Sequence, residues 1–153
     1  MRSLDKIDLE ILRILQEDGR ITNADLAKAI KLSPPSTLQR VRQLEQAGAI
    51  RGYTAVLDAE KLGLKLTVIC QVTLSLHQER AIERFVRSIE EIPEVIECYN
   101  TSGTTDYYLK ILARDMKHYE SLVRERLSRI SGVGHINSSF VLAKHKQTMM
   151  LPL

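Results

Sequence analysis

The spacing of the apolar residues changes from a helical to an alternating period near residue 66. Up to residue 46 the apolar residues recur every three or four positions, as on one face of a helix. From Leu66 to Leu74 every second residue is apolar, as in a strand with one buried face. A chain of 153 residues can hold two small domains, each with its own modest core. We therefore expect an α+β protein whose first part is helical.

The first third of the sequence predicts three short helices and then a strand. Asp5, Thr22 and Ser33 are suitable capping residues for the three helices. Pro34 fits the first position of the third helix, where its missing N–H costs nothing. The run from residue 50 to residue 57 is strand-like and is expected to form a wing or a hinge strand. Two short helices joined by a tight turn are typical of a helix-turn-helix.

The third helix has one apolar side and one side suited to contact with DNA bases. A 100° projection places Leu38, Val41 and Leu44 on the inner side. The opposite side carries Ser36, Gln39, Arg40 and Gln43. Arginine can bond bidentately to guanine and glutamine to adenine in the major groove. An ordinary three-helix bundle with a polar surface helix is the alternative interpretation.

Further candidate DNA-binding residues lie beside the residues expected to contact bases. Lys31 and Arg42 lie on the flank, and Thr22 lies at a helix N-terminus, where contacts with phosphate are favoured. The full set of candidate DNA-binding residues is Thr22, Lys31, Ser33, Pro34, Ser36, Thr37, Gln39, Arg40, Arg42 and Gln43.

The basic excess of the chain is concentrated in this region. The net charge of the whole chain is only +3. Residues 20–52 hold six basic and two acidic residues, a net charge of +4, whereas the remainder holds 16 basic and 17 acidic residues. This distribution favours contact with phosphate, and a solvated surface patch is the alternative.

Residues 64–153 predict the order strand, helix, strand, strand, helix, strand. Apolar residues at helical spacing fill residues 82–89 and 119–127, and strand-like runs fill 66–74, 95–101, 107–113 and 136–142. This order is that of a ferredoxin-like βαββαβ domain, with both helices on one face of a four-stranded antiparallel sheet. Ile69, Tyr99 and Val141 would be exposed on the other face of a monomer, so we expect subunits to pair.

Composition excludes several classes of protein. No apolar run is long enough to span a membrane, and residues 1–15 do not resemble a signal peptide, so a cytoplasmic protein is expected. Cys70 and Cys98 both lie in apolar strand-like runs and are expected to be buried, reduced thiols.

Other functions find little support in the sequence. We expect neither catalytic residues nor a metal site, because His77, His118, His135 and His145 lack the spacing of metal ligands and no nucleophile has a partner base. An RNA-binding sheet should carry stacking aromatic residues, whereas only 5% of this chain is aromatic. An amino-acid-sensing module that does not bind DNA remains an alternative, and salt-dependent binding to duplex DNA separates it from a DNA-binding protein.

Several motifs, in the same order, resemble those of the Lrp/AsnC (feast/famine) family of transcriptional regulators. In the first part the matching stretches are residues 4–8, 18–22, 32–34, 40–45 and 48–50. Downstream they are residues 93–95, 103–107, 138–140 and 151–152. Residues 35–38 depart from the usual start of the third helix in this family, so no operator sequence can be carried over.

The resemblance implies a winged helix-turn-helix followed by a ferredoxin-like domain of the RAM type. It implies domains at residues 1–50 and 64–153 with a linker strand or hinge at 51–63. It also implies a regulator that binds double-stranded DNA, is not an enzyme and has no cofactor. The resemblance further implies that subunits pair through their sheets, that the dimers often form octamers, and that an amino acid binds between dimers. The turn from Gly103 to Tyr107 is the position that matches the family's effector site. There backbone N–H groups can hold a carboxylate and Asp106 can accept from an ammonium group. The candidate effector-binding residues are Tyr99, Thr101, Ser102, Gly103, Thr104, Thr105, Asp106, Tyr107 and Ser139. A polar hairpin without a ligand is the alternative interpretation of this loop.

Overall fold

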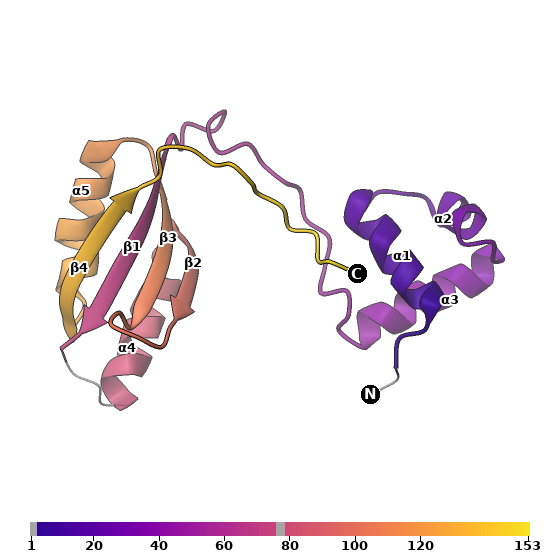
Figure 1. The fold of residues 1–153 in the computed structure, drawn as a ribbon, viewed down its shortest axis with the longest axis horizontal. Coiled ribbons are helices and arrows are strands. Elements are labelled where there is room, and N and C mark those ends of the chain that lie inside the picture. The colour runs from indigo at the N-terminus through magenta and orange to yellow at the C-terminus, as the bar shows by residue number, and fades with distance from the viewer. Residues whose placement is uncertain (1–2, 76–78) are drawn as a thin grey trace. The chain divides into compact units, whose positions relative to one another are not determined.

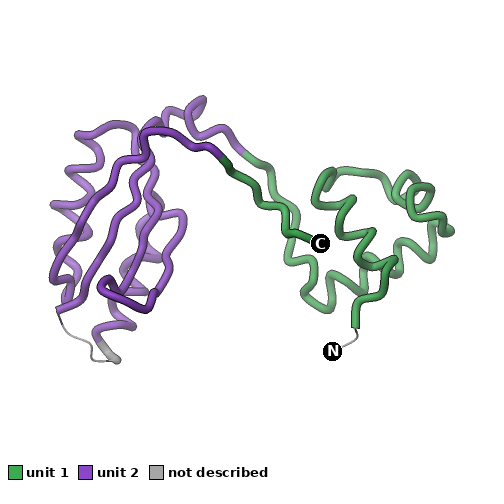
Figure 2. Tube along the Cα trace, viewed as in Figure 1, with its two compact units in different colours: residues 1–56, 146–153 green, residues 57–145 purple. Residues whose placement is uncertain are grey.

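The chain folds into two compact units in the computed structural model, which describes residues 3–75 and 79–153 (Figure 2). The first unit contains the described residues up to 56 together with residues 146–153, and residues 57–145 form the second. The sequence assigns residues 146–153 to the C-terminal domain, and the structure places them with the first unit instead. The reason is local, because Arg13 and Gln16 donate hydrogen bonds to the backbone oxygens of Leu153 and Leu151.

Three helices with capped starts form the first unit (Figure 1). They are α1 (Lys6–Glu17), α2 (Asn23–Ala29) and α3 (Pro34–Gln46). Each predicted cap is confirmed, because the side chains of Asp5, Thr22 and Ser33 accept a hydrogen bond from the backbone N–H three residues later. The caps satisfy N–H groups that have no partner within a helix, so they fix where each helix begins.

The core of the first unit lies between these helices. Ile11, Leu26 and Leu44 are buried at its centre, one from each helix. The inner side of α3 is formed by Thr37, Val41 and Leu44, which recur at intervals of four and three residues. The prediction that Leu38 faces inward is wrong, since it lies about 100° around the helix from Thr37 and is 40% exposed.

The strand predicted for residues 50–57 does not form. These residues have no strand assignment, and the large side chains of Tyr53, Val56 and Leu57 are exposed. A strand is stabilised by hydrogen bonds to a neighbouring strand, and the apolar content of this run alone does not supply one. Residues 57–65 contain turns instead.

The second unit has the predicted ferredoxin-like topology (Figure 1). Its elements are β1 (Leu66–Leu74), α4 (Glu79–Glu90), β2 (Val95–Asn100), β3 (Tyr107–Ala113), α5 (Met116–Glu125), a 3₁₀ turn η1 (Leu127–Arg129) and β4 (Val133–Phe140). All neighbouring strands are antiparallel, and their order in the sheet is β2-β3-β1-β4. The fourth strand ends at Phe140, two residues earlier than expected, and Leu142 is 98% exposed.

One face of the sheet is buried beneath α4 and α5. Val68, Cys70 and Val72 of β1 point to this face, as do Leu109 and Ile111 of β3. The helices contribute further buried side chains, Phe85, Ile89, Tyr119 and Leu122. Full burial of an aliphatic or aromatic side chain contributes about 1.5–3 kcal/mol, so this alternation is the main source of stability in the unit.

The other face of the sheet carries a mixture of apolar and polar side chains. Ile69, Tyr99 and Val141 were all expected to be exposed: Tyr99 is, whereas Ile69 and Val141 are half-buried. On the same face Lys110 Nζ lies 2.6 Å from Glu97 Oε1, and this ion pair holds the pKa of Glu97 below its ordinary value. We call this surface the open face of the sheet.

The two cysteines differ in their surroundings. Cys70 is buried on the helix-covered face, where burial raises the pKa of its thiol. The prediction that Cys98 is buried is wrong, because β2 is an edge strand and its side chain is exposed. Within residues 3–75 and 79–153, no helix is both long and apolar enough to cross a bilayer.

Candidate DNA-binding and effector-binding sites

A tight turn joins α2 to α3 and holds the starts of the two helices together. The Asn23 side-chain amide donates to the backbone oxygen of Pro34 at 2.9 Å. Lys31 has a positive φ of 56°, and the next residue, Leu32, donates its N–H to Ala27 at 3.0 Å. These bonds close the chain within a few residues, as a helix-turn-helix requires.

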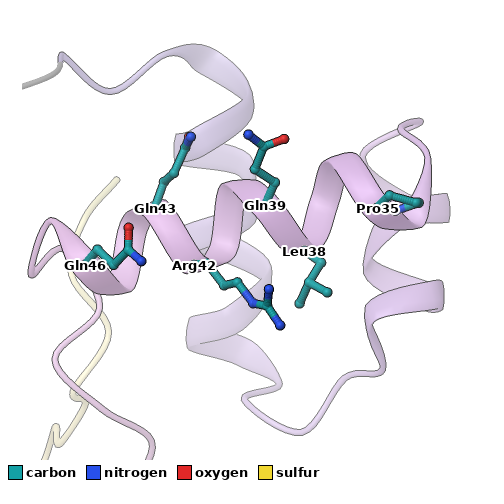
Figure 3. A pocket seen from close by; sticks show the side chains of 6 residues that line it. All are labelled: Pro35, Leu38, Gln39, Arg42, Gln43 and Gln46. Atoms are coloured by element: carbon teal, nitrogen blue, oxygen red, sulfur yellow. The ribbon is translucent and has the colours of Figure 1, made fainter.

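The solvent side of α3 forms a shallow groove, shown in Figure 3. Six residues line it, and we call them the α3 outer face: Pro35, Leu38, Gln39, Arg42, Gln43 and Gln46. Gln39 and Gln43 lie on one side of the helix in this view, and Leu38 and Arg42 lie on the other (Figure 3). The structure thus brings together three of the predicted DNA-binding residues, Gln39, Arg42 and Gln43.

Sequence reasoning missed the other three residues of this face. Gln46 follows Gln43 by three positions, so extending the projection by one turn would have included it. Pro35 precedes Leu38 by three positions and was missed because its side chain offers no hydrogen-bonding group. Leu38 was missed because its apolar side chain was assigned to the core.

Arg40 does not belong to the α3 outer face, which corrects its predicted role in base contact. Its Nη1 atom lies 2.7 Å from Asp8 Oδ1 and 2.8 Å from Asp5 Oδ2, and only 23% of its side chain is exposed. The two carboxylates raise the pKa of the Arg40 guanidinium, Asp5 more than Asp8. The backbone N–H of Asp8 and the Arg40 guanidinium together hold the pKa of Asp5 below its ordinary value. Arg40 therefore fastens α3 to the start of α1.

Thr37 is likewise a structural residue and not a surface one. Its side chain is fully buried, and its hydroxyl donates to the backbone oxygen of Ser33 at 3.0 Å. Ser33 and Pro34 occupy the cap and the first position of α3, and Ser36 is half-buried beside them. The predicted contacts of Thr37 with DNA are therefore incompatible with its position.

The predicted phosphate contacts lie near the turn. Lys31 is exposed. Thr22 is exposed, but its hydroxyl already accepts from Asp25 N at 3.1 Å and donates to Asp25 Oδ2 at 2.6 Å. The pKa of Asp25 is lowered mainly by this hydroxyl.

The predicted effector loop is anchored to the end of β1. Asp106 Oδ2 accepts from Leu74 N at 2.7 Å, and Asp106 N donates to Val72 O at 3.2 Å. Inside the loop Thr101 Oγ1 donates to Thr105 O at 2.9 Å. The carboxylate of Asp106 thus stabilises the loop as well as being a candidate acceptor for a ligand.

The tip of the loop is exposed and contains a glycine in an unusual conformation. Gly103 has φ +131°, and a Cβ atom built there would meet nothing within 4 Å. Ser102, Gly103 and Thr104 are exposed, and Thr101 and Thr105 are half-buried. A side chain at position 103 is therefore opposed by backbone strain and not by lack of space.

Two of the predicted effector-binding residues are not at this loop surface. Tyr107 is buried in the core, where its ring centroid lies 4.6 Å from that of Phe85. Ser139 pairs with Ile69 on the open face of the sheet, three residues along β1 from Val72. At about 3.4 Å per residue, this places Ser139 roughly 10 Å from the loop anchor. Tyr99 is exposed on the open face beside the loop and donates to Glu97 Oε2 at 2.8 Å.

The described histidines have structural or exposed positions. His118 Nε2 lies 3.3 Å from Glu94 Oε1, and its Nδ1 accepts from Arg114 N. His135 and His145 are exposed, and His77 lies outside the described residues. Among the residues that the structure describes, no three histidine, cysteine or carboxylate side chains are grouped to hold a metal.

Two family models match the two parts of the chain and differ from the compact units at residues 146–151, which the second model includes. Residues 4–51 match a winged helix-turn-helix DNA-binding model, and residues 67–151 match the Lrp/AsnC ligand binding domain. The chain belongs to the Lrp/AsnC family. The resemblance stated from the sequence motifs is confirmed.

Relatives and solved structures agree with this membership over nearly the whole chain. The leucine-responsive regulatory protein of Escherichia coli is 40% identical over 98% of this chain and 92% of its own length. The transcriptional regulator AzlB of Bacillus subtilis is 37% identical, covering 98% and 96% of the two chains. A crystal structure of a Neisseria meningitidis transcriptional regulator in complex with L-methionine has TM-score 0.94 and 40% identity, covering 98% and 97%.

Membership in the Lrp/AsnC family decides between the function classes left open by the sequence. The chain is a transcriptional regulator with a helix-turn-helix DNA-binding domain, and it is not an enzyme. The fold, an N-terminal helix-turn-helix followed by a ferredoxin-like domain, is that of the family's solved structures.

Proposed function

We propose that the α3 outer face enters the major groove of duplex DNA and that an amino acid bound by the second unit changes the affinity for DNA. The proposed binding of DNA is supported by three hydrogen-bonding side chains on the α3 outer face, Gln39, Arg42 and Gln43. Glutamine amides match adenine and guanidinium groups match guanine in the major groove. Each such contact contributes about 1–3 kcal/mol of discrimination between bases.

Pairing of subunits would present two copies of α3 to one DNA molecule. The open face of the sheet, with Ile69, Tyr99 and Val141, is the surface we assign to this pairing. We propose a homodimer that assembles further to an octamer, acting on DNA in the cytoplasm. Palindromic half-sites about 34 Å apart, one turn of duplex DNA, are expected for such a dimer.

The amino-acid part of the proposal is supported by the loop at residues 101–106. This loop lies within the part of the chain that matches the family's ligand binding domain. Its exposed glycine can direct backbone N–H groups at a carboxylate. The complex of the Neisseria regulator with L-methionine, and the name of the leucine-responsive relatives, indicate the class of ligand. Thr101, Ser102, Thr104 and Thr105 offer hydroxyls for further contacts.

Binding to duplex DNA is tested by selection from a random duplex library, followed by titration with the selected sequence. Gln39→Ala and Gln43→Ala should each lose about 1–3 kcal/mol of discrimination at one base position. Arg87→Ala, an exposed arginine of α4, is the control and should leave binding unchanged. Failure of the unmodified protein to prefer any duplex over random competitor at moderate salt would refute the proposal.

Effector binding is tested by a thermal-shift screen of the twenty amino acids with mass measurement in solution. At least one amino acid should raise Tm, and Gly103→Val should remove that shift, because the side chain strains the loop that we assign to the ligand. A full response in the Gly103→Val protein would place the ligand elsewhere. A protein that stays monomeric at all concentrations would contradict the proposed pairing.

A further inference from the structure

The α3 outer face contains one apolar side chain that the core of the first unit does not need. Leu38 is 40% exposed, and the inner side of α3 is already filled by Thr37, Val41 and Leu44. Of the residues that line the groove, only Pro35 and Leu38 lack hydrogen-bonding side chains. Leu38 is thus an exposed leucine among polar side chains that include one cation, Arg42, and a partner for this face could place one small apolar group against it.

The neighbours of Leu38 limit what that partner can be. Arg42 follows it by four positions on the same side of the helix in Figure 3, and Gln39 lies on the other side of the helix in that view. None of the residues that line the groove is acidic. The face therefore offers amide and guanidinium donors together with a single branched aliphatic side chain.

The major groove of DNA presents this combination of groups. Guanine and adenine offer acceptors to arginine and glutamine, and the 5-methyl group of thymine is the apolar group on the base edges. Four residues of helix rise about 6 Å, and successive base pairs lie about 3.4 Å apart. A contact of Leu38 would thus fall about two base pairs from a contact of Arg42.

We propose that Leu38 contacts the 5-methyl group of a thymine and so determines specificity at one position of each half-site. This inference rests on the proposed binding of DNA by α3. Removing this methyl group from the thymine should weaken DNA binding about fourfold, which is the typical effect of losing one buried methyl group.

The test uses the duplex selected from the random library, with each thymine replaced in turn by 2′-deoxyuridine, which lacks only the methyl group. One substitution per half-site should weaken binding about fourfold for the unmodified protein. Leu38→Ala should bind the thymine duplex less tightly and should show no difference between thymine and deoxyuridine at that position. Leu38→Met, which keeps an aliphatic side chain, should restore most of the difference.

A matched control separates this effect from general loss of apolar surface. Leu62→Ala removes another exposed leucine, from residues 57–65, and should leave the penalty for deoxyuridine unchanged. Circular dichroism and mass in solution should be the same for all variants, because Leu38 is not part of the buried core.

The possible results distinguish this inference from the proposed function. Tight binding of a selected duplex without any penalty for deoxyuridine, or with a penalty that Leu38→Ala retains, overturns the role of Leu38 and leaves DNA binding intact. A selected half-site without thymine also overturns the role of Leu38 and leaves DNA binding intact. Absence of any preference for a duplex overturns both.

Discussion

Arg40 Nη1 donates a hydrogen bond to Asp8 Oδ1 at 2.7 Å, which joins the helix that carries the α3 outer face to the first turn of α1. The Asp8 side chain is only 2% exposed, so its charge is largely removed from water and the ion pair with Arg40 helps to stabilise it. Asp5 takes part through a second bond of 2.8 Å. The orientation of α3 is thus fixed by charges that lie at its back, away from the α3 outer face.

Arg40→Ala should destabilise the first unit by about 1.5–3 kcal/mol, because the buried carboxylate of Asp8 loses a charged hydrogen bond. The loss should appear in urea denaturation and as faster hydrogen exchange in α1 and α3. Lys28→Ala, which removes an ion pair whose lysine is 79% exposed, should change stability by less than about 1 kcal/mol. Equal effects of the two substitutions would contradict the assignment.

The same substitution should weaken binding to all DNA sequences without changing the preferred one. Arg40 positions α3 and lies outside the groove, so its loss should not relax discrimination at a single base. Selection from a random library with Arg40→Ala should recover the consensus of the unmodified protein. A change at one guanine position would return Arg40 to the residues that contact bases.

Stability should fall as the medium becomes acidic, in part through Asp5. Its pKa in the folded chain lies below the ordinary value of 3.8, so its contribution is complete above that value and is lost as the pH falls through the lowered pKa. Asp5→Asn keeps the capping oxygen but not the charge, and should flatten the dependence of Tm on pH in the acid range. Glu10→Gln, at an exposed pair with Arg13, is the control and should leave the curve unchanged.

Asp106→Ala should destabilise the second unit by about 1–3 kcal/mol, because the partly buried N–H of Leu74 loses its acceptor. Asp106→Asn keeps an oxygen in the same place and should retain most of the stability. Ser102→Ala, at the exposed tip of the loop, should have no measurable effect. Hydrogen exchange at Leu74 reports directly on this bond, and unchanged protection in Asp106→Ala would disprove it.

At alkaline pH the second unit should lose stability through Tyr119. Burial raises the pKa of its phenol from 10.0 to about 12, and its hydroxyl shares a hydrogen bond with Ser138. The unfolded chain releases this proton first, so the free energy of unfolding should fall as the pH rises from 10.0 towards 12. Tyr119→Phe should remove part of that fall, and absorbance titration should show one fewer late-ionising phenol. A slope identical to that of the unmodified protein would contradict this assignment.

Features set by neighbouring residues could be predicted from the sequence. The caps at Asp5, Thr22 and Ser33 depend on contacts only three residues away, and they begin the helices where expected. The alternation along β1 and β3 gave the buried face of the sheet correctly, since side chains in a strand alternate strictly. The topology followed from the order of these elements.

Features set by contacts between residues far apart in the sequence could not be predicted. Arg40 and Asp5 are 35 positions apart, so a helical projection that treats α3 alone assigned the guanidinium to solvent. The same projection could not decide whether Thr37 or Leu38 faced inward, because adjacent positions differ by only 100° and a threonine is not an obvious core residue. The strand expected at residues 50–57 failed for a related reason, as its partner strand cannot be identified from its own residues.

The hydrogen bonds from Arg13 and Gln16 to the backbone of residues 151 and 153 mean that the first unit is discontinuous along the chain. A single cut in the connecting residues would not excise it intact. An isolated fragment of residues 1–56 would lack the segment that covers this side of α1, and its stability would understate that of the same helices in the full-length protein. Dissection of this regulator into separate halves therefore requires a fusion that restores residues 146–153 to the helical half.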